Sequence, residues 1–303
     1  MVWLALLTVY IVWGSTYFAI ALVVQSMPPL LTAGFRFLLA GLILAAYIAV
    51  RERAALAVNH RQLRGAAVVG ILLLAGGNGL VVLGERTVPS GLAALIVASI
   101  PLWIVILRLI AGDKVRRDVI LGVSIGIIGV AVLVVPSGIS GGVDPIGLLM
   151  LVGAPMLWAT GTFLSTKMEM PRSAFASTAY QMVAGGVVLL IIGPLVGELR
   201  ALDPAKFTAA SLSGFAYLVV FGSLLAYSAY TWLLQNTSVS LVSTYAYVNP
   251  VVAVFLGTLF LAEPITPTML VGAALILAAV AFIVRRTAGR AAMTRRAAVS
   301  RSA

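Results

Sequence analysis

The sequence predicts an all-α integral membrane protein: ten transmembrane helices forming two inverted five-helix repeats around a central cavity. The first observation behind this prediction is composition. Of the 303 residues, 62% are hydrophobic and only 10% are charged, and the mean hydropathy is +1.13. A soluble domain carries about a quarter charged residues, so this chain has too much apolar surface for a water-soluble globule. The lengths of the apolar runs and an internal repeat are the other two observations.

The apolar runs have the length of membrane spans. A spanning helix needs about 20 apolar residues, and ten runs of roughly that length are bounded by charges, prolines or glycine clusters. They cover residues 3–24, 30–50, 64–84, 90–111, 118–136, 147–167, 175–197, 211–234, 240–261 and 267–286. The links between them are mostly short, as in a compact helical bundle.

The basic residues predict the orientation of the spans. With the N-terminus in the cytoplasm, sixteen of the twenty Lys and Arg residues fall in inside links or the C-terminal tail, and three (Arg86, Arg200 and Lys206) fall outside. This bias places both termini in the cytoplasm of a multi-pass protein. The net charge of +11 is thereby explained by topology, and we expect no nucleic-acid partner. Residues 287–303 are expected to form a disordered, basic cytoplasmic tail.

The chain also matches itself at an offset of about half its length. The matched pairs are Trp13 with Trp158, Phe18 with Phe163, Arg36 with Gln181 and Gly41 with Gly186 at 145, Pro101 with Pro250 at 149, and Asp113 with Glu263 and Gly122 with Gly272 at 150. Residues 1–136 and 137–286 are therefore predicted to be two copies of one unit. Because each copy has five spans, the second enters the membrane inverted, an arrangement typical of secondary transporters with a midplane substrate site.

Several stretches resemble a known family. VWGSTYFAI and MPPLLTAGFRFLLAGLIL resemble the start of an EamA domain, and YVNPVVAVFLGTLFLAEPIT resembles the end of a second one. Over almost its whole length the chain is similar to the ten-helix EamA-type members of the drug/metabolite transporter superfamily. The resemblance implies a carrier of the bacterial inner membrane, commonly an exporter of amino acids or related metabolites, and it implies no particular substrate.

Polar and aromatic side chains within the apolar runs predict a binding cavity. Lipid offers polar atoms no partners, so such groups face protein or a water-filled space. Helical spacing places Trp13 and Thr16 beside each other and Trp158 one turn from Thr162. The expected cavity residues are Trp13, Thr16, Tyr17, Asn78, Trp158, Thr162, Tyr227, Tyr245 and Asn249. The alternative role of the tryptophans is packing between helices.

Arg36 is a basic residue well inside a span, and Gln181 is its counterpart in the second copy. One interpretation is a carboxylate clamp for an amino acid or organic acid, since a buried cation is costly and usually functional or paired. The other, which we favour from the sequence, is a structural role with the long side chain reaching the outer surface. Pro101 and Pro250 are expected either to act as hinges or breaks that form the site, or merely to kink their helices.

These patterns favour a secondary transporter that exports small amphipathic metabolites, such as amino acids, by alternating access. A multidrug or organic-cation efflux carrier is the alternative. A membrane enzyme is less favoured because the single histidine, His60, lies in a loop. A channel is less favoured because the sequence has neither the charged rings nor the filter sequence that a channel would carry. We expect no catalytic residue, metal or cofactor. The expected partners are the substrate and the lipid bilayer, with the protein a monomer or weak homodimer.

Overall fold

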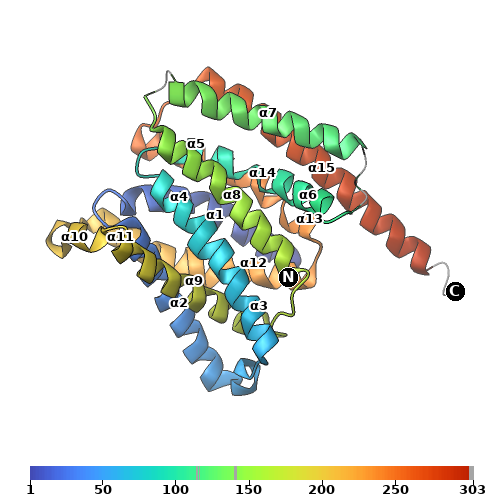
Figure 1. Ribbon diagram of the computed structural model, residues 1–303, viewed down its shortest axis with the longest axis horizontal. Coiled ribbons are helices and arrows are strands. Elements are labelled where there is room, and N and C mark those ends of the chain that lie inside the picture. The colour runs from blue at the N-terminus through green and yellow to red at the C-terminus, as the bar shows by residue number, and fades with distance from the viewer. Residues whose placement is uncertain (114, 116, 140–141, 300–303) are drawn as a thin grey trace.

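The computed structural model describes residues 1–113, 115, 117–139 and 142–299, and all secondary structure in these ranges is helical (Figure 1). The elements of the first half are α1 (Val2–Val23), α2 (Pro29–Arg51), η1 (Arg53–Leu56), α3 (His60–Gly70), η2 (Ile71–Asn78), α4 (Gly79–Gly84), α5 (Ser90–Val97), α6 (Ile100–Ile110) and α7 (Arg117–Ile139).

The second half repeats this pattern with extra short helices in its links. Its elements are α8 (Pro145–Ser165), α9 (Ala174–Leu195), α10 (Glu198–Ala201), η3 (Pro204–Lys206), α11 (Ala209–Tyr217), η4 (Leu218–Tyr227), α12 (Ser228–Asn236), α13 (Val239–Val242), α14 (Tyr245–Leu261) and α15 (Pro267–Val299). Proline at the first position favours the start of α2, α8 and α15, where a missing N–H leaves no bond unmade.

Eight helices in the described part of the chain are long and apolar enough to cross a membrane. They are Val2–Val23, Pro29–Arg51, His60–Gly84, Ser90–Ile110, Arg117–Val135, Pro145–Ser165, Ala174–Leu195 and Ala209–Asn236. The runs expected at 240–261 and 267–286 correspond to two shorter apolar helices, Tyr245–Leu261 and Pro267–Ile283. The first of these is short because the chain turns at Ser243 and Thr244, between α13 and α14. The structure therefore establishes a many-helix membrane protein without establishing the count of ten.

The third and eighth spans share an unusual feature. Each changes in its middle from α-helix to π-helix, over Ile71–Asn78 and over Leu218–Tyr227. A π-helix has wider turns than an α-helix and is frequent at functional sites. Because the two segments lie at corresponding places in the two halves, the departure from α-helix is a property of the repeated unit.

Helix packing follows the same repetition. Helices α2 and α9, which lie at corresponding places in the two halves, pack along each other, and so do α7 and α15 (Figure 1). Helix α1 packs on α14, and its counterpart α8 packs on α6; likewise η4 lies on α1 and η2 lies on α8. If each helix is replaced by its counterpart in the other half, the same set of helix pairs results. The core thus lies between the two halves, with α1 and α8 at its centre.

Close approach of α2 and α9 depends on glycine. A Cβ on Gly186 would lie 2.6 Å from the backbone nitrogen of Leu38, and a Cβ on Gly34 would lie 3.0 Å from the backbone nitrogen of Leu190. Small residues at such crossings let membrane helices pack backbone to backbone. This crossing fixes the position of Arg36 on α2 relative to the second half of the chain.

The links gather on two opposite faces of the bundle. We call the face with links 24–28, 85–89, 196–208 and 262–266 the cap side, and the face with links 52–59, 111–113, 166–173 and 237–238 the tail side. Hydrogen bonds join neighbouring links on each face, such as Thr208 to Ser26 on the cap side and Asn59 to Glu169 on the tail side. Helix α15 continues to Val299, beyond the end expected at 286, and the division of the chain at residues 136 and 286 stays a prediction.

Candidate functional site

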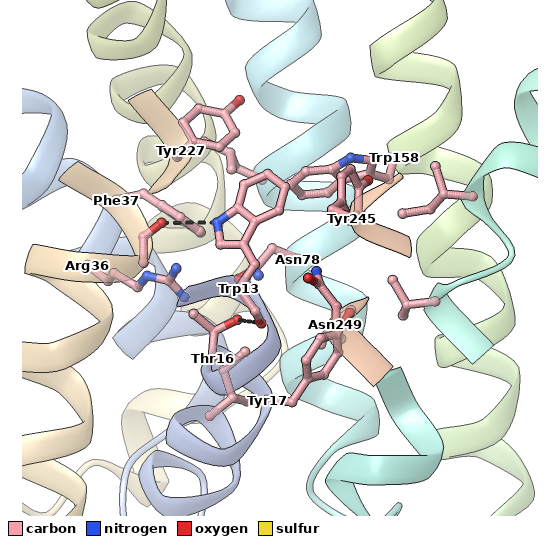
Figure 2. Close-up of a pocket in the computed structure, with 16 residues that line it drawn as sticks. Trp13, Thr16, Tyr17, Arg36, Phe37, Asn78, Trp158, Tyr227, Tyr245 and Asn249 are labelled. Atoms are coloured by element: carbon pink, nitrogen blue, oxygen red, sulfur yellow. Dashed lines mark hydrogen bonds between the residues drawn. The ribbon is translucent and has the colours of Figure 1, made fainter. Parts of the chain in front are cut away.

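A small cavity lies between the two halves, near the middle of α1 (Figure 2). Its free volume is about 60 Å³, room for about two water molecules at roughly 30 Å³ each. It is lined by Trp13, Thr16, Tyr17, Ile20, Arg36, Phe37, Leu74, Asn78, Val81, Val97, Ile100, Trp158, Gly222, Tyr227, Tyr245 and Asn249. Eight of the nine residues expected from the sequence are in this set, and they make up half of the sixteen lining residues.

Trp13 occupies the centre of an aromatic cluster. Its ring centroid lies 4.9 Å from that of Tyr230, and it meets Trp158 and Tyr245 edge to face at 5.4 Å each. Its indole N–H donates to the backbone oxygen of Gly222 at 3.2 Å, on the π-helical segment η4. Edge-to-face contacts of this kind contribute beyond area burial. The two tryptophans that match in sequence are therefore in direct contact, one from each half of the chain.

Arg36 points into the cavity from α2 (Figure 2). It is only 4% exposed, so the side chain lies inside the protein and does not reach the surface. Its Nε donates to Ser223 Oγ at 2.8 Å and the guanidinium lies 4.6 Å from the Phe37 ring centroid, whereas Nη1 has no hydrogen-bonding partner. Among the described residues Arg36 is the one charged side chain that lines the cavity, and no carboxylate pairs with it.

Two amides contribute the next polar groups of the wall. Asn78, at the end of η2, has a side-chain oxygen that is buried and has no hydrogen-bonding partner. Asn249, on α14, fits its surroundings with its amide nitrogen toward two carbonyls, donating to Tyr10 at 3.0 Å and Tyr245 at 3.2 Å. Asn249 therefore ties α1 to α14, while Asn78 keeps a polar atom available to a ligand.

Thr16 and Tyr17 continue the wall toward the cap side of α1. The Thr16 hydroxyl donates to the backbone oxygen of Trp13 at 2.6 Å, which leaves its methyl group toward Gly222. Tyr17 is 9% exposed and lines the cavity as expected. Both side chains belong to the same helical face as Trp13, as their spacing predicts.

Thr162 is the expected cavity residue that the structure places elsewhere. Its hydroxyl bonds Tyr230 at 2.8 Å and donates to the backbone oxygen of Trp158 at 2.9 Å. It lines a second cavity of about 250 Å³, on the tail side of the aromatic cluster, together with Pro101, Ile104, Val105, Arg108, Asp113, Phe163, Thr166, Lys167, Val239, Ser243 and Ile283. One helical turn along α8 therefore separates the two cavities.

Gln181 does not line the central cavity. Its amide nitrogen donates to Ser177 Oγ at 2.8 Å, and its oxygen accepts from the Tyr227 hydroxyl at 2.6 Å. Gln181 is 3% exposed and lies behind the cavity wall. It orients Tyr227, which is itself a lining residue, so its contribution to the site is indirect.

The two matched prolines differ in their surroundings. The fourth span breaks at Ala98 and Ser99, directly before Pro101 near the start of α6. Pro250 instead lies inside α14, and the chain breaks six to seven residues earlier, at Ser243 and Thr244, between α13 and α14. Val97 and Ile100, on either side of the first break, line the central cavity. Tyr245, directly after the second break, lines it too, so both breaks lie beside the cavity and only the first lies next to its proline.

Tyr230, Ser223, Gly222 and Phe37 also belong to the site and were absent from the expected set. Tyr230 is 1% exposed and contacts both tryptophans. Its spacing of three residues from Tyr227 was the available signal, since such residues share a helical face. Gly222 and Ser223 gave no comparable signal, because an α-helical pattern does not apply within a π-helix.

A buried carboxyl lies near the cavity without lining it. Glu85 follows α4, is 6% exposed, and neither of its oxygens has a hydrogen-bonding partner among the described residues. Burial, and next the charge of Glu263, raise the pKa of this carboxyl well above its usual range. Desolvation of this kind disfavours the charged form of a carboxyl group.

Known proteins are similar to this chain in sequence and in the arrangement of their helices. The EamA-like transporter family model matches residues 1–135 and 145–285. An uncharacterized inner membrane transporter of Escherichia coli K12, YedA, is 42% identical over 259 residues, covering 84% of this chain and 81% of that protein. Protein PecM of Dickeya dadantii is 29% identical over 277 residues, covering 90% of this chain and 88% of that protein.

One solved structure, described as a crystal structure of protein, superposes with a TM-score of 0.66 at 19% identity. It covers 94% of this chain and 97% of that one, and so supports the fold. The family model matches both halves of the chain, and the helices around the cavity come from both halves. The chain belongs to the EamA-like transporter family, and it is a membrane transporter.

Proposed function

We propose that the protein is a secondary carrier that exports small amphipathic metabolites bearing a carboxylate, such as amino acids, by alternating access. The observation that carries the substrate class is Arg36, a buried guanidinium whose Nη1 has no partner and which lines the central cavity. Buried charges in proteins are normally paired. An anionic group on the substrate supplies that partner, and the fork of the guanidinium suits a carboxylate.

The rest of the wall fits the remainder of such a molecule. Asn78 has an unpartnered amide oxygen, which accepts a hydrogen bond from an amine or hydroxyl of the substrate. Trp13, Trp158 and Tyr245 present apolar ring surface to a side chain. A cavity with one cation, one free amide and aromatic walls favours an amphipathic acid over a bare ion.

The small volume of the central cavity supports a site that opens and closes. At about 60 Å³ it does not hold an amino acid without movement of the aromatic side chains. The larger tail-side cavity, beyond Thr162, offers a route to it once Trp13, Tyr230 and Tyr245 separate. In this view the structure is an occluded state, and the break before Pro101 is one point at which the helices bend.

We further propose ten membrane spans in two inverted repeats, residues 1–136 and 137–286, with both termini in the cytoplasm. The support is the family match to one segment in each half, the exchange symmetry of the helix pairings, and the excess of Lys and Arg on the tail side. The tail side is then cytoplasmic. The inner membrane is the proposed location, because YedA is described as an inner membrane transporter, and the working unit is a monomer or weak homodimer.

The test is transport by purified protein in liposomes. Radiolabelled neutral amino acids and small organic acids are expected to exchange saturably, with loss of exchange in Trp13→Ala and Trp158→Ala at retained folding. Arg36→Gln is expected to lower exchange of these anions about 10–100-fold, since a charged hydrogen bond to the carboxylate is lost. An organic cation serves as the comparison probe, because the alternative function is multidrug or organic-cation efflux. Saturable cation transport that survives Arg36→Gln, without transport of any carboxylate, contradicts the proposal.

A further inference from the structure

Two glutamates on the cap side hold the starts of helices from the other half of the chain. Glu198 accepts from the backbone nitrogens of Leu30 at 3.0 Å and Leu31 at 2.8 Å, at the start of α2. Glu263 accepts from Ser90 at 2.7 Å and Gly91 at 2.9 Å, at the start of α5. A carboxylate bonded to the first N–H groups of a helix is favoured by both charge-assisted bonds and the helix dipole.

The contact of Glu263 is built into the local backbone. Ala262, the residue before it, has φ of 54° in the left-handed region, which turns the chain back so that the Glu263 N–H donates to Gly257 at 3.2 Å. A Cβ on Gly257 would lie 2.4 Å from Glu263 Oε2, so glycine leaves room for the carboxylate between α14 and α5. A left-handed conformation in a non-glycine residue is costly and marks a functional constraint.

The same backbone arrangement recurs on the tail side, 150 residues earlier. Gly112, the counterpart of Ala262, also lies in the left-handed region with φ of 81°, and Asp113, the counterpart of Glu263, donates its N–H back to Arg108 at 2.9 Å. In both places a residue in the left-handed region precedes the acid, and the N–H of the acid bonds back to the end of the preceding helix, six residues earlier for Glu263 and five for Asp113. Its carboxylate, however, bonds Arg108 Nε at 2.9 Å and, among the described residues, reaches no helix start.

The residues that correspond to Ser90 and Gly91 lie across the tail-side cavity from Asp113. They are residues 239–241, at the start of the ninth span, and Val239 and Asp113 both line that cavity of about 250 Å³. At present Ser238 Oγ bonds the N–H of Leu241 at 3.3 Å. A hydrogen bond from Arg108 holds the pKa of the Asp113 carboxyl below its usual range, so the acid is charged and able to accept.

We propose that Glu263 and Asp113 are alternating latches: Glu263 closes the cap side in this structure, and in the opposite state Asp113 closes the tail side by bonding residues 239–241. This inference rests on the proposed alternating access. In inverted repeats, the two halves exchange conformations between states, so a contact made on one face is broken there and made by its counterpart on the other. Trading one charged contact for another keeps the two states close in free energy.

The experiment measures distances across both faces of the full-length protein in lipid nanodiscs. The chain has no cysteine, so spin labels attach only at introduced sites. Exposed positions serve: Arg86→Cys with Ile265→Cys reports the cap side, and Ile110→Cys with Asn236→Cys reports the tail side. Glu263→Gln is expected to shift the populations about tenfold or more toward a wider cap-side and a narrower tail-side distance, since a charged hydrogen-bonded contact is lost. Asp113→Asn is expected to shift them the opposite way.

Three further variants separate the proposed role of the two acids from a general effect of removing a charge. Gly257→Ala displaces the Glu263 carboxylate without changing its charge and is expected to act like Glu263→Gln. Asp203→Asn is the matched control, because within the described part of the chain this cap-side carboxylate bonds only the nearby Ala205 and Lys206. Arg108→Gln frees Asp113 and is expected to favour the narrow tail-side distance. Shifts in the same direction for Glu263→Gln and Asp113→Asn, or none in either, overturn the proposal.

The latch and the transport function fail in distinguishable ways. Opposite shifts of the two distances without any substrate exchange in liposomes support the latch and contradict the carrier proposal. Saturable exchange with unchanged distances in all latch variants supports the carrier and contradicts the latch. Protein that elutes as one species and retains its helical content qualifies each variant for the comparison.

Discussion

Arg36 and Gln181 occupy matching places on α2 and α9, two helices that pack along each other, yet the two side chains differ in charge, in position relative to the cavity and in hydrogen bonding. Arg36 is charged, lines the central cavity and keeps one nitrogen without a partner. Gln181 is neutral, lies behind the wall, and has both ends of its amide bonded. The scaffold is repeated, and the polar groups of the site are not. A second unpartnered cation in the membrane would add a large desolvation cost with no partner to offset it.

A second pair shows the same contrast. Glu85, after α4 in the first half, is buried with neither oxygen bonded. Gln235, 150 residues later near the end of α12, is neutral and donates to the backbone oxygen of Pro171 at 3.2 Å. In both pairs the first half holds an ionisable side chain with a buried polar atom that has no partner among the described residues, and the second half holds an amide that makes hydrogen bonds. The two halves therefore carry different polar groups on a shared arrangement of helices.

Replacing the two matched residues of α2 and α9 gives the largest expected difference. Arg36→Gln is expected to lower exchange of carboxylate substrates about 10–100-fold, since a charged hydrogen bond contributes about 1.5–3 kcal/mol. Its thermal midpoint is expected not to fall, because a buried unpartnered cation is removed. Gln181→Ala is expected to lower the midpoint and to retain exchange. Initial rates in liposomes and thermal unfolding in detergent measure both; equal loss of exchange in the two variants contradicts the contrast.

The packing that brings the halves together gives the next effect. A Cβ on Gly70 would lie 2.3 Å from the backbone oxygen of Gln181, so Gly70→Ala forces α3 away from α9. We expect the free energy of unfolding to fall by about 1–3 kcal/mol, as for other overpacked cores. Gly153→Ala is the control, since its new methyl meets only Leu80 Cδ1 at 3.2 Å, the end of a flexible side chain. Matching unfolding midpoints for the two variants would show that the crossing is looser than its distances indicate.

A double-mutant cycle tests the supporting role of the second half. The Tyr227 hydroxyl donates to Gln181 at 2.6 Å, and Tyr227→Phe leaves that buried oxygen without its partner. We expect Tyr227→Phe and Gln181→Leu each to cost about 1 kcal/mol of unfolding free energy, with a coupling of about 0.5–1.5 kcal/mol in the double variant. Additive effects in thermal unfolding would mean that the two groups do not stabilise each other.

Glu85→Gln is expected to have the smallest effect on the free energy of unfolding at acidic pH. The folded-state pKa of Glu85 lies above its unfolded value, so the stability that its protonated form contributes is present at low pH and is lost as pH rises through the raised pKa. Glutamine is neutral at every pH. The variant is therefore expected to match the parent within about 0.5 kcal/mol near pH 4 and to be the more stable at alkaline pH. Unfolding midpoints measured from pH 4 to pH 9 check this, and a constant difference across the series contradicts it.

Much of the site was open to prediction because helical spacing is a local property. Trp13, Thr16 and Tyr17 share a face of α1 whatever surrounds it, and all three line the cavity. Helical spacing does not predict the depth along a helix at which a side chain meets the cavity. Thr162, one turn beyond Trp158, falls on the far side of the aromatic cluster, and Tyr230 enters that cluster from a helix that follows a π-helical segment. Spacing rules based on 3.6 residues per turn lose their register across such a segment.

By itself the sequence determined the class of protein, the repeat and the candidate wall, because hydropathy and self-similarity are sums over residues that need no coordinates. Only the tertiary structure decided what each polar group contacts. Arg36 and Gln181 are interchangeable in the repeat pattern, yet one faces a cavity and the other bonds Ser177 and Tyr227. Hydrogen bonding depends on distance and direction between groups on several helices, and those are fixed by how the two halves pack.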